Sequence, residues 1–167
     1  MIKTSKIESN ISDLVEQKNE LINSMLEICE MGTTKEKAFT ISCTESPRDK
    51  GTINELNNGA IEIVVSGGTY ENAIHEFFHA YDCWRGNTYK TIEGEIHAYK
   101  RQYSFNKYSM PQSVYGGLKS IFDVDDLWLL GVYDSSGDYV YKFMRDTENR
   151  YNNNQWMKII KTASKSK

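Results

Sequence analysis

The feature that most constrains the fold of this chain is a pair of histidines, His75 and His79, that stand four residues apart. On an α-helix, residues i and i+4 lie on one face, so the two imidazoles can hold a single ion. Neutral imidazole is a good ligand for zinc. Glu76 follows His75 directly, about 100° around the helix, where its carboxylate can take a proton from a zinc-bound water. The spacing therefore predicts a helix over residues 69–84 that binds Zn²⁺.

This His-Glu-x-x-His helix resembles the signature of the zincin metallopeptidases, and the recognisable match covers residues 60–102. The resemblance implies a zincin-like fold, a zinc-dependent peptidase activity and a peptide or protein substrate. It also implies an antiparallel edge strand just upstream that pairs with the extended substrate, and residues 60–66 occupy that place. A peptidase of this small size is similar to bacterial metallopeptidase toxin or effector domains, which would add an inhibitor or immunity protein as a partner.

A catalytic zinc ion needs a third protein ligand, and the helix expected over residues 91–108 offers Glu93, Glu95 and His97. The apolar stripe of this helix consists of Ile92, Ile96, Tyr99 and Tyr103. Glu95 flanks the stripe beside the small Ala98, which favours it modestly. Glu93 suits the first helical turn through the macrodipole, and His97 lies on the polar side, so both stay open. The resemblance to the gluzincin subgroup strengthens Glu95, because there the third ligand is a helical Glu often followed three residues later by Ala or Ser.

Supporting residues are harder to select. Asp82 shares the helical face of His79, so it is a candidate to orient a ligand imidazole, and a surface pair with Arg85 is the alternative. Amide hydrolysis also needs a hydrogen-bond donor for the developing oxyanion. The candidates for this donor are His97, Arg101, Tyr115 and Tyr133.

The flanks of the motif predict a small α+β domain over residues 1–167. Residues 5–30 form an amphipathic helix expected to pack its apolar face on the core, with binding of a partner as the alternative. A strand over 37–44 and a hairpin around Asn57-Asn58-Gly59 predict a small antiparallel sheet.

The region after residue 111 is less regular. We expect a short helix over 113–122 and strands over 124–133 and 139–143, paired around the turn at 134–137. Residues 145–161 form a polar segment anchored by Trp156, Ile159 and Ile160.

Composition excludes several classes of protein. The 167 residues contain 20 Lys plus Arg against 23 Asp plus Glu, a balance that argues against a nucleic-acid-binding module. No apolar run reaches the length of a membrane span, and the N-terminus does not resemble a signal peptide. The expected location is therefore the cytoplasm, or outside the cell by a route other than Sec.

Three widely spaced cysteines, Cys29, Cys43 and Cys83, predict buried free thiols.

Two other functions fit the same motif. The first is a binding protein that keeps the zincin fold but does not cleave peptides. The second is a closed structural zinc site, in which His97 or Glu93 completes four protein ligands.

Overall fold

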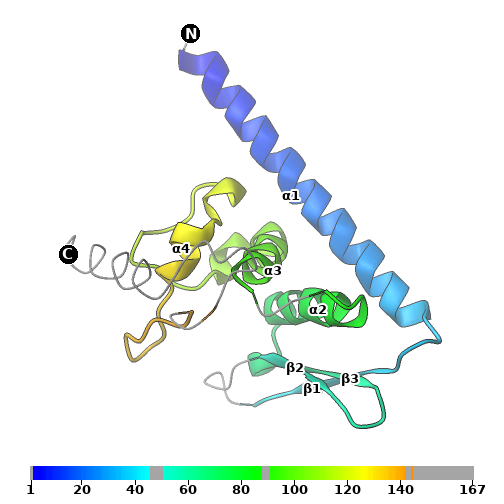
Figure 1. Ribbon diagram of the computed structural model, residues 1–167. Helices are drawn as coiled ribbons and strands as arrows, with labels where there is room; N and C mark the ends of the chain where they lie inside the picture. The colour runs from blue at the N-terminus through cyan, green and yellow to red at the C-terminus, as the bar shows by residue number, and fades with distance from the viewer. Residues whose placement is uncertain (1, 46–50, 88–90, 142–143, 145–167) are drawn as a thin grey trace.

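The computed structural model describes residues 2–45, 51–87, 91–141 and 144. This part of the chain is an α+β structure with four α-helices and a three-stranded sheet (Figure 1). The elements are α1 (Ile2–Thr33), β1 (Phe39–Cys43), β2 (Thr52–Glu55), β3 (Ile61–Val65), α2 (Tyr70–Trp84), α3 (Ile92–Phe105) and α4 (Asp126–Leu130). Short 3₁₀ turns lie at Ser66–Gly68, Lys107–Ser109 and Ile121–Asp123.

The sheet is mixed, with the order β1-β3-β2. The predicted hairpin is confirmed, because β2 and β3 pair antiparallel around a turn in which Gly59 has a positive φ of 81°. The purely antiparallel sheet is wrong, since β1 pairs parallel to β3. The edge position of residues 60–66 is wrong as well. The alternate residues Ile61, Ile63 and Val65 are buried, so the most apolar strand lies in the centre and has neighbours on both sides.

Two apolar clusters hold the fold together. One joins the sheet to α2, and its buried members are Met31, Ile53, Ile61, Ile63, Val65, Ala80 and Cys83. The other joins α3 and α4 to the segments around them, and its buried members are Ile92, Tyr99, Tyr103, Ile121, Val124, Trp128, Leu129, Leu130 and Val132. The helices α2 and α3 contact each other between the two clusters, and this places their facing surfaces at the centre of the molecule.

The two central helices begin where the sequence predicts. The side chain of Thr69 accepts a hydrogen bond from the backbone of Asn72 at the start of α2, and Thr91 does the same for Gly94 in α3. Gly86, with φ of 75°, follows the end of α2. The prediction for α2 is confirmed, while α3 ends at Phe105, three residues before the expected end.

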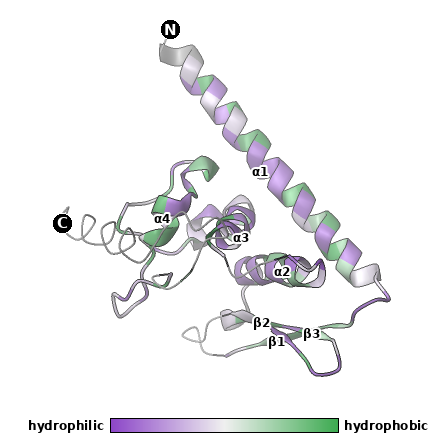
Figure 2. Cartoon of the chain, viewed as in Figure 1, coloured by the Kyte–Doolittle hydropathy of each residue, from purple (hydrophilic) through white to green (hydrophobic). Residues whose placement is uncertain are grey.

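The orientation of α1 contradicts the sequence prediction. The apolar positions expected in the core are exposed, and they include Ile7, Ile11, Leu14, Ile22, Met25 and Leu26. Figure 2 shows these hydrophobic residues recurring along α1, including the part that extends beyond the other helices. The face that contacts the rest of the protein is largely polar, and its buried members include Glu20 and Ser24.

Hydrogen bonds explain the orientation of α1. The guanidinium of Arg101, buried on α3, donates to the carbonyl and carboxylate of Glu20 and, at 2.7 Å, to the carboxylate of Glu27. Nearer the N-terminus, Asp13 accepts hydrogen bonds from the hydroxyl of Ser120 and the backbone N–H of Ile121. A buried cation without partners would be costly, so the acidic face of α1 turns inward and the apolar face turns out.

Several predictions for the remaining segments are wrong. The expected strand over 124–133 contains α4 instead. Within the described part of the expected strand over 139–143, one antiparallel bridge, between Tyr133 and Tyr139, flanks the turn at 134–137. The expected helix over 113–122 is absent, and its last two residues begin the 3₁₀ turn Ile121–Asp123. The polar segment over 145–161 lies outside the described residues.

The cysteines are free, but only one is buried. Cys83 lies in the cluster beneath the sheet, where its thiol donates to the Glu55 carboxylate at 3.1 Å. Cys29 and Cys43 are exposed, so the prediction of three buried thiols fails for these two. Among the described helices, none combines the length and apolar character needed to cross a membrane.

Candidate metal centre

His75 and His79 on α2 and Glu95 on α3 converge at the contact between these helices. The Nε2 atoms of the two histidines lie 3.1 Å apart. The two carboxylate oxygens of Glu95 lie 3.4 Å from these nitrogens, Oε2 from His75 and Oε1 from His79. All three side chains are buried or nearly so. Among the described residues this is the one cluster of three such side chains whose ligand atoms face a common point.

The spacing of the donor atoms fits a divalent metal ion. A tetrahedral zinc ion with bonds of about 2.0–2.2 Å places its ligands roughly 3.3 Å apart. The separation of 3.1 Å between the two Nε2 atoms and the 3.4 Å from each Nε2 to the nearer oxygen of Glu95 lie close to that value, and the two 3.4 Å contacts use different oxygens of the one carboxylate. Two imidazoles and one carboxylate are also a ligand set that zinc accepts. Three protein donors leave a fourth position open.

The charges within the site favour an ionised carboxylate between two imidazoles. Burial alone would raise the pKa of Glu95, but hydrogen bonds and positive charge from His75 and His79 outweigh it and hold this pKa well below its usual range. Burial opposes a charge on His75, yet the neighbouring carboxylates, Glu95 first, raise its pKa. The site therefore attracts positive charge, whether as protons or as a metal ion.

Glu76 lies in the same cavity but is not one of the three converging side chains. Burial raises the pKa of its carboxyl, against the opposing effect of the two histidines. Its carboxylate packs against the backbone of Gly51, just before β2. A Cβ atom on Gly51 would lie 2.2 Å from Oε1 of Glu76, so a side chain at position 51 would displace this carboxylate.

The structure adds three residues that the sequence interpretation missed. The ring of Tyr99 lies 4.5 Å from that of His75, measured between centroids, and its hydroxyl is 2.6 Å from the hydroxyl of Tyr141. Tyr141 also interacts with Glu95, and burial is the largest cause of its raised pKa. The amide of Gln102 interacts with His75. The sequence could have indicated Tyr99 and Gln102 as residues of the site, because they lie four and seven positions after Glu95 on the same helical face. Tyr141 had no such signal.

The open side of the site is a cavity of about 700 Å³. One wall begins at the start of β2, with Gly51, Thr52 and Ile53. The His75–His79–Glu95 cluster lines the same cavity, together with residues 132–135, 140, 141 and 144. The three candidate metal ligands therefore share this cavity with the start of β2 and with residues from the C-terminal half of the described chain.

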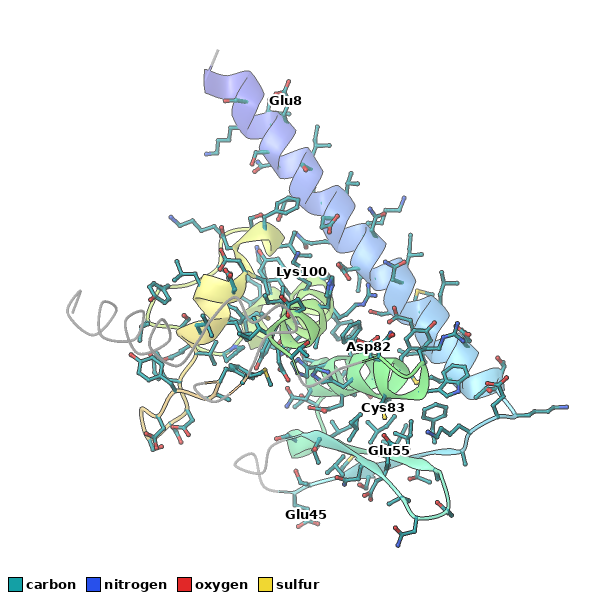
Figure 3. All side chains as sticks on the ribbon, in the orientation of Figure 1. Glu8, Glu45, Glu55, Asp82, Cys83 and Lys100 are labelled. Atoms are coloured by element: carbon teal, nitrogen blue, oxygen red, sulfur yellow. The ribbon has the colours of Figure 1, made fainter. Side chains whose placement is uncertain are left out.

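Asp82 and His97, two of the residues predicted to support the metal ligands, do not line the cavity. Asp82 lies on the side of α2 that faces α1, whereas Cys83 faces the sheet (Figure 3). Its carboxylate accepts a hydrogen bond from Asn87 at 3.0 Å, and the alternative partner Arg85 binds Glu30 instead. His97 packs on Phe78, with 6.0 Å between ring centroids.

Three of the predicted oxyanion donors do not reach the cavity. The first is His97, which packs on Phe78. The second is Arg101, which binds Glu20 and Glu27 of α1, and the third is Tyr115, which packs against Gly131. Tyr133 is the exception, because it lines the cavity. Glu93, the rival carboxylate, is not part of the three-residue cluster, whose carboxylate comes from Glu95.

Comparison of this chain with models of protein families, with curated proteins and with solved structures gave no match.

Proposed function

We propose that this chain is a zinc-dependent metallopeptidase of the gluzincin type with a zincin-like fold. The observation that carries the proposal is the set of 3.1–3.4 Å separations among His75, His79 and Glu95, with the carboxylate of Glu76 in the same cavity. These three residues would hold the ion. Zinc bound there supplies Lewis-acid chemistry, which lowers the pKa of a water molecule and polarises a carbonyl.

Glu76 is the general base in this proposal. Its carboxylate takes a proton from the attacking water and then donates it to the nitrogen of the leaving amine. Burial raises the pKa of Glu76 above its usual value, which makes its carboxylate a stronger base. The contact with Gly51 fixes the position of the carboxylate at the cavity wall.

Tyr141 supports the oxyanion in this proposal, in place of the donors suggested by the sequence. The hydroxyl of Tyr141 lies beside Glu95 and shares a hydrogen bond with the hydroxyl of Tyr99. These two contacts fix the orientation of the phenol within the cavity. A phenol keeps its proton at neutral pH, so its hydroxyl can donate a hydrogen bond to a developing negative charge.

An extended peptide would pair with β2. This strand is at the edge of the sheet, its first two residues line the cavity, and an edge strand has free backbone groups. The central strand β3 has no free edge, so residues 60–66 are not available for this purpose. The substrate class is therefore an extended segment of a peptide or protein.

The two rival functions make different predictions. A closed structural site needs a fourth protein ligand, and the candidates fit poorly because His97 packs on Phe78 and Glu93 lies outside the cluster. A binding protein without activity would not depend on the carboxylate of Glu76. Substitution of Glu76 therefore separates an enzyme from a binding protein.

The first experiment measures bound metal and cleavage together. We expect about one zinc per chain by elemental analysis, on protein purified without added zinc or chelator. We then incubate a peptide library with the wild type, with Glu76→Gln and with Glu45→Gln, a control at an exposed position. Mass spectrometry should find the same cleaved peptides for the wild type and the control, and none for Glu76→Gln at equal zinc content.

Two results would refute the proposal. If the protein contains no zinc and takes up none at micromolar concentration, the metal site is wrong. If zinc is bound but Glu76→Gln cleaves as the wild type does, the assignment of the general base is wrong.

A further inference from the structure

The exposed side of α1 carries a continuous apolar stripe. We define the stripe as Ile7, Ile11, Leu14, Val15, Ile22, Met25, Leu26 and Cys29, and its seven large side chains are 42–67% exposed. The contacts with Arg101 and Ser120 use the opposite face of the helix. Monomeric proteins rarely leave a large apolar surface of this kind in contact with water, which favours an interface on this side of α1.

The spacing of the stripe identifies its partner. The central positions are 7, 11, 14, 18, 22, 25 and 29, which are separated by 4, 3, 4, 4, 3 and 4 residues. This series reads the same in both directions. When a second α1 lies antiparallel with Lys18 at the centre, Ile7 faces Cys29, Ile11 faces Met25, and Leu14 faces Ile22. Six of the eight residues of the stripe are therefore complementary to one another across the pair, while Val15 and Leu26 flank the line of contact.

The period of the stripe also suits two helices that stay straight. The spacings of 4, 3 and 4 residues form a unit of 11 residues that occurs twice. Such a unit spans three helical turns, which gives about 3.67 residues per turn, close to the 3.6 of an undistorted helix. Helix α1 is straight in the structure (Figure 1), so the stripe keeps to one side along its whole length. Because the rest of the protein contacts the opposite face, two copies can pair through α1 without a collision between their remaining parts.

The area available is sufficient for a specific dimer. A typical interface buries about 800 Å² on each partner. Seven large apolar side chains, each 42–67% exposed, supply most of such an area from one helix. Lys18 is the one charged residue among the seven central positions. At the centre of the pair it would face its own copy, which weakens the dimer and keeps it reversible.

We propose that α1 is a dimerisation helix, and that two copies of this chain pair antiparallel through the apolar stripe about Lys18. The cavity contains no residue of α1, so this proposal does not depend on the peptidase activity.

Sedimentation equilibrium of the full chain from 1 to 200 µM tests the proposal. We expect a reversible monomer–dimer equilibrium for the wild type. Leu14→Glu should raise the dissociation constant at least 100-fold, because it places two buried carboxylates in the interface. Lys18→Leu should lower it at least tenfold. Asn23→Glu, an exposed position outside the stripe, should leave it unchanged. Circular dichroism checks that every variant keeps its helices.

Cysteine crosslinking tests the direction of the helices. In a Cys43→Ser background, the antiparallel pair brings position 7 next to Cys29 of the other copy. Ile7→Cys should therefore give a covalent dimer on mild oxidation, and Cys29 alone should not. A wild type that is monomeric over the whole range, a Lys18→Leu variant that does not dimerise more tightly, or crosslinking through Cys29 alone would each overturn the proposal.

Discussion

Gly51→Ala is the sharpest test of the general base, because it adds a single methyl group at the carboxylate of Glu76. The new Cβ would lie 2.2 Å from Oε1, whereas ordinary contact begins at 3.4 Å. The carboxylate must therefore move by about 1 Å, a displacement that can cost roughly 100-fold in rate. That loss corresponds to about 2.7 kcal/mol of transition-state stabilisation. The atoms nearest to the added Cβ all belong to Glu76, so zinc should remain bound.

The assay compares initial rates for a peptide that the wild type cleaves, with zinc content measured on the same samples. Gly117→Ala is the matched control, because a Cβ there meets nothing within 4 Å. We expect the Gly51→Ala rate to fall roughly 100-fold, while Gly117→Ala keeps the wild-type rate. A Gly51→Ala enzyme with the wild-type rate and pH profile would show that the position of Glu76 does not matter, and would refute the reasoning.

Three further predictions address the metal and the oxyanion. Glu95→Ala should abolish zinc binding measured by elemental analysis, whereas Glu93→Ala should not, and the reverse result would exchange their roles. Zinc affinity should fall as the pH is lowered, because the raised pKa of His75 means that zinc must displace a proton. Competition with a chromophoric chelator should show a loss of about tenfold per pH unit for each proton displaced, and a flat profile would contradict this. Tyr141→Phe should lower kcat about 100-fold with unchanged zinc content, and an unchanged kcat would exclude Tyr141 as the donor.

The parts of the site that the sequence predicted are those fixed by local geometry. His75, Glu76 and His79 share a short stretch of one helix, so helical periodicity alone places them. Glu95 required a comparison of faces on a second helix, and the structure brings it to the two histidines. The start of the helix at Thr69 and the turn at Gly59 are local in the same sense as the histidine pair. Apart from Glu95, each of these predictions depends on residues fewer than ten positions apart.

The failures for α1, for β3 and at Tyr141 concern partners that are distant in sequence. Helical periodicity predicts an apolar stripe on α1 but does not indicate which side of the helix faces the core. The hydrogen bonds of Arg101, 81 residues from Glu20, direct the polar face of α1 inward. The central position of β3 depends on how β1 pairs after a long connection. Tyr141 reaches the cavity through the turn that follows Tyr133, and nothing in its own neighbourhood indicates that position.

The two faces of α3 determine which variants can separate the two proposals. Glu95 and Tyr99 face the cavity, while Arg101 faces α1. Removal of α1 would leave the guanidinium of Arg101 buried without its two carboxylates, and breaking a buried ion pair in this way typically costs about 3–5 kcal/mol. The helix that carries Glu95 would then be destabilised, so a truncated protein would lose zinc even if dimerisation had no role in the site. Substitutions in the exposed stripe leave Glu20 and Glu27 in place. We therefore expect Leu14→Glu to be monomeric with a full complement of zinc, and a loss of zinc in this variant would show that the dimer supports the metal site.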